Sequence, residues 1–104
     1  MNTLFTAFWY NHQVKLTRPP VGPPQETVLY GPLCMNIDVV RDKCLLPNLH
    51  RGEQVVIHPV GAYNVTQSMQ FIEMKPAVVL VSPKGEVKLI KRRETMEDMV
   101  AMES

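Results

Sequence analysis

The sequence predicts a mainly β domain: a small Greek-key-type β-barrel with a short C-terminal helix. Three observations predict it. Nine prolines and five glycines cut the 104 residues into short segments, most of those segments are rich in β-branched residues, and only the C-terminal residues have helical spacing. About six to eight short strands with one terminal helix are typical of small antiparallel barrels or sandwiches.

The strand candidates follow one another along the chain, and most of them end at a turn signal. In order, they cover residues 5–16, 27–30, 38–40, 54–58, 76–81 and 86–91. Residues 18–24 hold four prolines, which lack backbone donors and predict an extended surface loop. Residues 42–52 are also typical of a loop, because Pro47 and Gly52 interrupt them.

The last two strand candidates are predicted to form a hairpin. Residues 82–85 place Pro and Gly in turn positions between them. In the second arm Val87 and Leu89 alternate with Glu86 and Lys88. This alternation is the pattern of a half-exposed strand.

The C-terminal helix is predicted from its first turn and its apolar stripe. Thr95 offers an N-cap hydroxyl with the Asp98 carboxylate three residues later, close to a capping box. Met96, Met99 and Val100 then fall at positions i, i+3 and i+4. We expect these three side chains to pack the helix onto the domain.

Composition limits what a chain of this size does. Eleven Lys and Arg against ten Asp and Glu give a net charge of +1, so no charge excess indicates a nucleic acid or an acidic lipid as partner. No apolar stretch approaches the roughly 18 residues of a membrane span, and residues 1–10 lack the features of a signal peptide. Cys34 and Cys44 form neither a CxxC pair nor a disulfide framework, which favours a reducing, cytoplasmic compartment.

The histidines predict no metal site. His12, His50 and His58 lie in separate segments without metal-ligand spacing. His58 ends an apolar strand and is most simply a hydrogen-bonded strand-end residue. The sequence also holds no phosphate-binding glycine loop and no nucleophile or zinc-protease motif.

Cys34 and Tyr63 each have two interpretations. Cys34 follows a turn forced by Gly31 and Pro32, so it is either an exposed thiol placed for proton transfer, with Asp38 four positions on, or a small buried hydrophobe. Tyr63 ends a Gly-Ala-Tyr turn, where its phenol either meets an anion or only packs and hydrogen-bonds.

Four stretches together resemble a known family. Residues 31–38 (GPLCMNID), 61–63 (GAY), 76–81 (PAVVLV) and 92–95 (RRET) have the order and approximate spacing of the C-terminal β domain of fold-type III, pyridoxal-phosphate-dependent amino-acid decarboxylases. The diaminopimelate and ornithine decarboxylase-like branch is the subgroup that this pattern resembles. The resemblance covers nearly the whole chain.

The resemblance implies an active site shared between subunits. In that family the β domain follows a (β/α)₈ barrel, which holds the cofactor through a Schiff-base lysine, and completes the partner's site in a head-to-tail homodimer. Cys34 would be the acid that reprotonates the substrate carbon, and Tyr63 would contact the cofactor phosphate. Met35, Asp38 and Phe71 would belong to the substrate pocket.

Three positions depart from the family pattern. Met35 stands where members acting on diamino acids have a carboxylate, Thr6 falls where diaminopimelate enzymes have a clamping arginine, and Ile72 replaces an asparagine after Phe71. Each change exchanges a charged or polar group for a neutral or apolar one. We therefore expect an amino-acid-type substrate whose far end is neutral, bulky or carried on another molecule.

Nothing in the sequence resembles the (β/α)₈ domain. We expect residues 1–104 to be the C-terminal domain of a longer decarboxylase, from a truncated gene or a fragment, and to be inactive and to bind pyridoxal phosphate weakly when alone. Two other interpretations remain: a non-catalytic homologue used for dimerisation or regulation, and a free-standing binding module.

Overall fold

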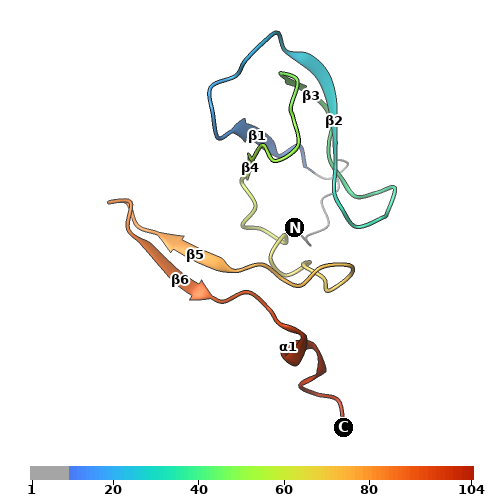
Figure 1. The fold of residues 1–104 in the computed structure, drawn as a ribbon, viewed down its shortest axis with the longest axis vertical. Coiled ribbons are helices and arrows are strands. Elements are labelled where there is room, and N and C mark those ends of the chain that lie inside the picture. Colours follow the sequence, from blue (N-terminus) through green and yellow to red (C-terminus); the bar gives the residue numbers. More distant parts are fainter. Residues whose placement is uncertain (1–9) are drawn as a thin grey trace.

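The computed structural model describes residues 10–104, so the part of the first strand candidate before Tyr10 lies outside the described residues. Within that range the chain is mainly β with one short helix, as predicted (Figure 1). The elements are β1 (Gln13–Leu16), β2 (Gln25–Tyr30), β3 (Val39–Leu46), β4 (Val55–His58), β5 (Val78–Val81), β6 (Val87–Lys91) and α1 (Met96–Val100).

The strands pair into three separate antiparallel ladders. β1 pairs with β4, β2 with β3, and β5 with β6. The β1–β4 register sets Val14 opposite Ile57, so this ladder joins distant parts of the sequence. Across residues 10–104 the ladders are not joined into a closed barrel, so the predicted barrel is not confirmed.

The prediction of a loop over residues 42–52 was wrong in its first half. β3 continues through Leu46, with Thr27 opposite Cys44 and Glu26 opposite Leu45. Asp42 and Lys43 are compatible with the strand because both are exposed to solvent, and Lys43 Nζ forms an exposed ion pair with Glu26 Oε2 at 2.9 Å. Polar composition therefore indicated exposure here rather than the absence of a strand.

A small core lies at β3 and at the connection that precedes it. Leu33, Val40 and Leu46 are the buried hydrophobic residues of the described chain. Arg41 Nη1 donates to the carbonyl of His12 at 2.9 Å, and His12 Nδ1 lies 2.6 Å from the carbonyl of Pro59. These contacts tie β3 to the chain before β1 and after β4.

His58 does not match its predicted environment. We expected a hydrogen-bonded residue at the end of its strand, and His58 does close β4 opposite Gln13. Its Nε2 atom, however, is buried without a hydrogen-bond partner among the described residues.

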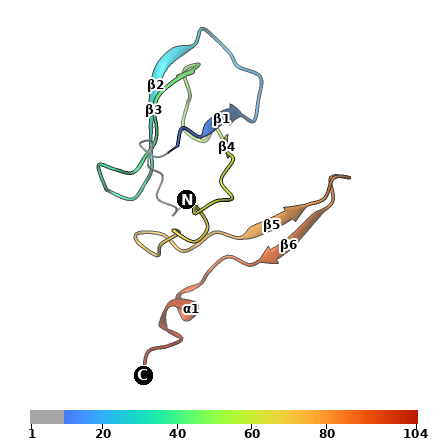
Figure 2. The ribbon, with the colours of Figure 1, turned by 180° about the vertical axis from the view of Figure 1, so that it is seen from behind.

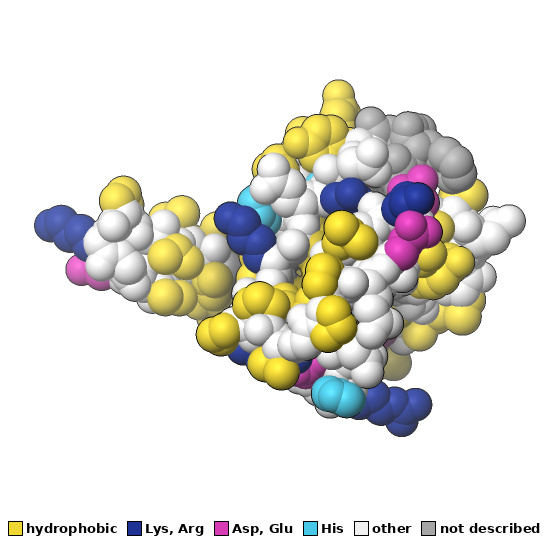
Figure 3. Space-filling view, turned by 90° about the horizontal axis from the view of Figure 1, so that it is seen from above, with side chains coloured by type: hydrophobic (Ala, Val, Ile, Leu, Met, Phe, Trp, Pro, Cys, Tyr) yellow, Lys and Arg dark blue, Asp and Glu magenta, His cyan; other side chains and the backbone are white. Residues whose placement is uncertain are grey.

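The β5–β6 hairpin projects from the rest of the chain as an apolar arm (residues 78–91; Figures 1 and 2). Val79, Val81, Val87 and Leu89 share one face of this arm because they occupy paired positions of the ladder. Each is at least 50% exposed, and hydrophobic side chains gather on the arm in the space-filling view (Figure 3). The half-exposed pattern predicted for β6 is therefore not observed, since all five of its residues are exposed.

The exposed surface is large for a chain of this mass. It measures 8122 Å², whereas a compact monomer of this size exposes about 6,000 Å². The radius of gyration is 15.7 Å, against about 13 Å for a compact domain of the same length. The excess of roughly 2,000 Å² is larger than the roughly 800 Å² that each partner contributes to a standard protein interface.

The C-terminal helix forms where it was predicted but does not pack. It begins after Thr95, and none of its residues is buried. Met96 and Val100 are exposed, so the predicted contact of the apolar stripe with the domain was wrong. Figure 2 shows the reason: α1 lies at the opposite end of the molecule from the first two ladders.

The exposed arm predicts where substitutions leave stability unchanged. We expect Val87→Thr to change the free energy of unfolding by less than about 0.5 kcal/mol, because this side chain is already in water. Leu33→Ala should cost about 2–5 kcal/mol, because Leu33 is fully buried. Urea unfolding of both variants measures the difference, and a comparable loss in both would contradict the observed exposure of the arm.

Candidate functional site

Cys34 lies in the tight connection between β2 and β3. Its side chain is exposed and its φ is 53°, while the adjacent Leu33 is fully buried. The loop is closed at its base by a hydrogen bond from Gly31 N to the carbonyl of Asp38, at 2.7 Å. Of the two interpretations of Cys34, the structure supports the exposed thiol.

Asp38 lies beneath this loop. It is 1% exposed, and its Oδ2 accepts a hydrogen bond from the backbone N–H of Leu33 at 2.9 Å. A β-carbon on Gly31 would overlap the Asp38 carboxylate, so only glycine leaves room for it. Met35, by contrast, is partly exposed on the loop.

Tyr63 and Phe71 lie in the long connection between β4 and β5. Tyr63 is 74% exposed with a φ of 68°, and its carbonyl accepts hydrogen bonds from Gln67 N at 2.8 Å and Thr66 Oγ1 at 2.9 Å. These bonds form a compact turn that directs the phenol into solvent. Phe71 is also exposed.

Three non-glycine residues of the described range 10–104 adopt a left-handed backbone, and each lies in or beside a stretch singled out from the sequence. They are Cys34, Tyr63 and Ile72. Such a conformation costs a non-glycine residue of order 1–3 kcal/mol and persists only where the surroundings enforce it. Strain gathered at these loops is typical of functional positions, and no sequence pattern revealed it at Ile72.

The segment that carries Phe71 is held by Glu94, a role that the sequence did not reveal. Glu94 Oε1 accepts from Gln70 Nε2 at 2.5 Å, Oε2 accepts from Lys75 N at 3.0 Å, and Glu94 N donates to the Lys75 carbonyl at 3.0 Å. The Lys75 backbone N–H is the main reason that the pKa of Glu94 lies below its ordinary value. One side chain thus fixes both ends of residues 70–75.

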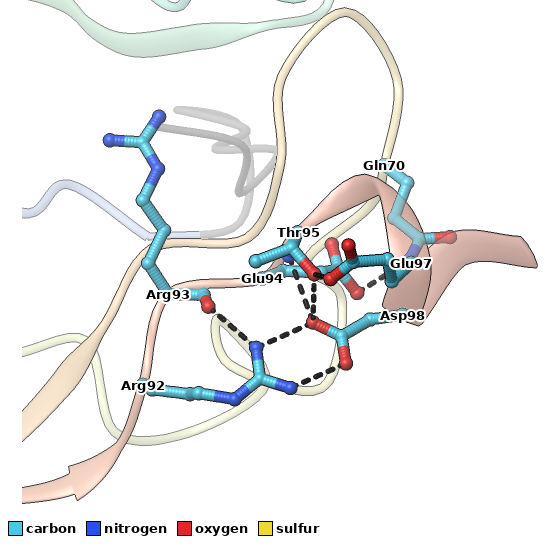
Figure 4. A network of polar contacts seen from close by, with 7 residues as sticks. All are labelled: Gln70, Arg92, Arg93, Glu94, Thr95, Glu97 and Asp98. Atoms are coloured by element: carbon cyan, nitrogen blue, oxygen red, sulfur yellow. Dashed lines mark hydrogen bonds and ion pairs between the residues drawn. The ribbon is translucent and has the colours of Figure 1, made fainter. Parts of the chain in front are cut away.

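The neighbouring residues of the same RRET stretch start the helix (Figure 4). Arg92 donates to both carboxylate oxygens of Asp98 at 2.6 Å, and Thr95 N donates to Asp98 Oδ2 at 2.8 Å. The Arg92 guanidinium, followed by the Thr95 N–H, holds the pKa of Asp98 well below its usual range. The predicted pairing of Thr95 with Asp98 is confirmed.

The structure divides the candidate residues between two loops. Cys34, Met35 and Asp38 share the β2–β3 connection, whereas Tyr63 and Phe71 share the β4–β5 connection. Within residues 10–104 no hydrogen bond joins the two loops. The same residues contain no cluster of three or more potential metal ligands and no helix long and apolar enough to cross a membrane.

Comparisons with known proteins agree with this arrangement. A family model described as the C-terminal sheet domain of pyridoxal-dependent decarboxylases matches residues 1–61. Diaminopimelate decarboxylase of Escherichia coli K12 is 32% identical over 89 residues, which cover 79% of this chain and 21% of that protein. The enzyme of Methanothermobacter thermautotrophicus is 30% identical over 103 residues, covering 95% and 24%. The crystal structure of diaminopimelate decarboxylase from M. jannaschi superposes with a TM-score of 0.77 at 29% identity, covering 89% of this chain and 21% of that chain.

These matches define the class of this chain as the sheet domain of a pyridoxal-dependent enzyme family. The chain belongs to the pyridoxal-dependent decarboxylase family, and it matches the C-terminal sheet domain of that family. The resemblance drawn from residues 31–38, 61–63, 76–81 and 92–95 is thereby confirmed. The chain spans only about a fifth to a quarter of the length of the relatives named above.

The two thiols should differ in reactivity. Burial raises the pKa of the Cys44 thiol, with the charge of Arg41 acting in the opposite direction, and Cys44 Sγ donates to the Thr27 carbonyl at 3.5 Å. We expect iodoacetamide to modify the exposed Cys34 at least about tenfold faster than Cys44. Peptide mass spectrometry during the reaction measures both rates, with Cys34→Ser as the control that leaves only the slow thiol. Equal rates would contradict the exposed loop.

The cap of α1 should resist acid. The pKa of Asp98 is lowered, so its carboxylate stabilises the folded state fully at any pH above its ordinary pKa of 3.8. This stabilisation is lost only as the pH falls through the lowered pKa. We expect the Thr95 amide resonance to stay constant from neutral pH down through 3.8. In Arg92→Ala the pH at which the Thr95 amide resonance changes should rise toward 3.8, because the Arg92 hydrogen bond is the largest cause of the lowered Asp98 pKa. A wild-type transition at 3.8 would show that the Arg92 contact does not hold in solution.

Proposed function

We propose that this domain is part of a pyridoxal-phosphate-dependent enzyme that decarboxylates an amino acid at its α carbon. The observation that supports this most directly is the exposed Cys34 thiol in a domain that matches the sheet domain of this family. Cys34 has a left-handed backbone, and the loop that carries it rests on a buried residue, Asp38. A thiol placed in this way can supply the one proton that the α carbon needs after carbon dioxide leaves. Cys34 is the proposed general acid.

Tyr63 is the proposed contact to the cofactor phosphate. Its exposed phenol fits a single hydrogen bond to an anion, which contributes about 0.5–1.5 kcal/mol, far below the ~8 kcal/mol of micromolar binding. Bound pyridoxal phosphate supplies the electron sink for the reaction. We therefore assign the covalent anchor to a lysine of a (β/α)₈ domain and expect the isolated chain to be inactive.

We further propose that residues 1–104 are the C-terminal domain of a longer chain that works as a homodimer. The excess exposed surface and the apolar arm support this, because a domain that functions alone rarely leaves such a face uncovered. Closure of the sheet into a Greek-key barrel belongs to the same proposal, since the unpaired edges of the three ladders are available to further strands. Both cysteines are free, which supports a cytoplasmic protein.

The proposed substrate has a neutral, bulky or carrier-bound far end. Met35 stands beside Cys34 in place of an acid and cannot pair with a substrate ammonium group. Phe71 adds an exposed aromatic surface. Asp38 is 1% exposed and acts on the proposed pocket only through the Cys34 loop above it, and Thr6 lies outside the described residues. The alternative is that the rest of the enzyme restores the missing charge and the substrate is a diamino acid.

A non-catalytic homologue used for dimerisation or regulation is the second candidate. The strained backbone at Cys34 and Tyr63 argues against it, because a purely structural loop would gain stability from glycine at those positions. A free-standing binding module is disfavoured by the family match.

The proposal is tested in the longer enzyme with two neighbouring substitutions. Cys34→Ala should lower decarboxylation at least about a hundredfold, because it removes the proton donor, whereas Met35→Glu should raise turnover of a diamino acid relative to the native substrate. Carbon dioxide release measures both.

The isolated chain provides a separate control, in which titration with pyridoxal phosphate should give no saturable micromolar change in absorbance. Full activity of Cys34→Ala would overturn the proposed acid. Ordinary efficiency of the unmodified enzyme on diaminopimelate or lysine would overturn the proposed substrate.

A further inference from the structure

Asp38 is a buried carboxylate that no surface partner explains. It is 1% exposed, and one of its oxygens, Oδ1, has no hydrogen-bond partner among residues 10–104. Leaving a buried acceptor unpaired is unfavourable, so the other contacts of Asp38 must offset this cost. Its other contacts all go to the loop that carries Cys34.

Asp38 binds that loop at three points. Its carbonyl accepts from Gly31 N at 2.7 Å, its Oδ2 accepts from Leu33 N at 2.9 Å, and its own N–H donates to the Met35 carbonyl at 3.1 Å. The residues immediately before and after Cys34 are therefore both fixed by one residue. Cys34 between them is left with a φ of 53° and an exposed side chain.

The surroundings leave no substitute for this contact. Leu33 is 0% exposed, so water does not reach its N–H in place of the carboxylate. The carboxylate fits only because Gly31 has no side chain in the space that it occupies. A cysteine keeps a left-handed backbone only when contacts of the neighbouring residues enforce it. The contacts of Asp38 with Leu33 and Met35 do so here.

We propose that Asp38 is a positioning residue whose carboxylate holds the Leu33–Cys34 backbone in the conformation that presents the Cys34 thiol. The effect of Asp38 on catalysis rests on the proposed function of Cys34. Its effect on the backbone conformation of Leu33 and Cys34 does not depend on that function. This role changes the interpretation of Asp38 from a wall of the substrate pocket to the support of the acid. Gly31 is part of the same arrangement, because its lack of a side chain leaves the space that the Asp38 carboxylate occupies.

The test uses the 104-residue chain and four variants. In Asp38→Ala the Leu33 amide should exchange with solvent at least tenfold faster, and the strong intraresidue Hα–HN nuclear Overhauser effect of Cys34 should weaken. Asp38→Asn keeps a carbonyl acceptor and should stay within about threefold of the native exchange rate. Asp42→Ala, which removes an exposed carboxylate from β3, is the matched control and should change neither signal.

Gly31→Ala keeps the test decisive if Asp38→Ala does not fold, because it displaces the carboxylate without removing it. It should reproduce the faster Leu33 exchange. Unchanged Leu33 exchange in both Gly31→Ala and Asp38→Ala would overturn the proposal.

In the longer enzyme Asp38→Ala should lower kcat at least tenfold with KM changed less than about twofold, and Asp38→Asn should restore most of kcat. A KM effect alone would overturn positioning in favour of substrate binding. If Cys34→Ala were fully active, the proposed function would fail while the nuclear magnetic resonance result on Asp38 still stood.

Discussion

The hydrogen bond from the Leu33 N–H to the buried Asp38 carboxylate is the constraint on which the candidate site depends. It closes the β2–β3 connection from inside, so that Leu33 enters the core while Cys34 faces out. A carboxylate is suited to this task because it accepts a backbone hydrogen bond more strongly than a neutral group does. The cost is one unpaired oxygen in the interior, and the result is a fixed direction for a thiol.

The second loop is held by the same kind of interaction over a longer distance in the sequence. Glu94 fixes both ends of residues 70–75, and the adjacent Arg92 and Asp98 start the helix. The RRET stretch, which helped to identify the family, is therefore structural in this chain. Among residues 10–104 its hydrogen bonds go to Gln70, Lys75 and the start of the helix rather than to Cys34 or Tyr63, and Glu94 holds the segment that carries Phe71.

The domain buries few hydrophobic side chains and leaves many exposed, which is typical of a domain that packs against other protein. Among residues 10–104 three hydrophobic side chains are buried, while the apolar arm exposes residues that a self-sufficient domain would cover. The arm lies far from the Cys34 loop along the chain, so coverage of the arm and presentation of the thiol are separate tasks. This separation agrees with a domain that both packs against other protein and supplies a group to an active site.

Sequence alone determined the features that depend on neighbouring residues. The β5–β6 hairpin follows from its Pro and Gly turn, the start of α1 from Thr95 and Asp98, and the importance of Cys34 and Tyr63 from short motifs. Tertiary structure decided what distant residues do to one another. It extended β3 through Asp42 and Lys43 because these residues are exposed, and it left the three ladders of residues 10–104 separate. It also left Met96, Val100 and β6 exposed and buried Asp38 against Gly31. Burial and left-handed backbone depend on which segments meet in space, and local sequence patterns do not contain that information.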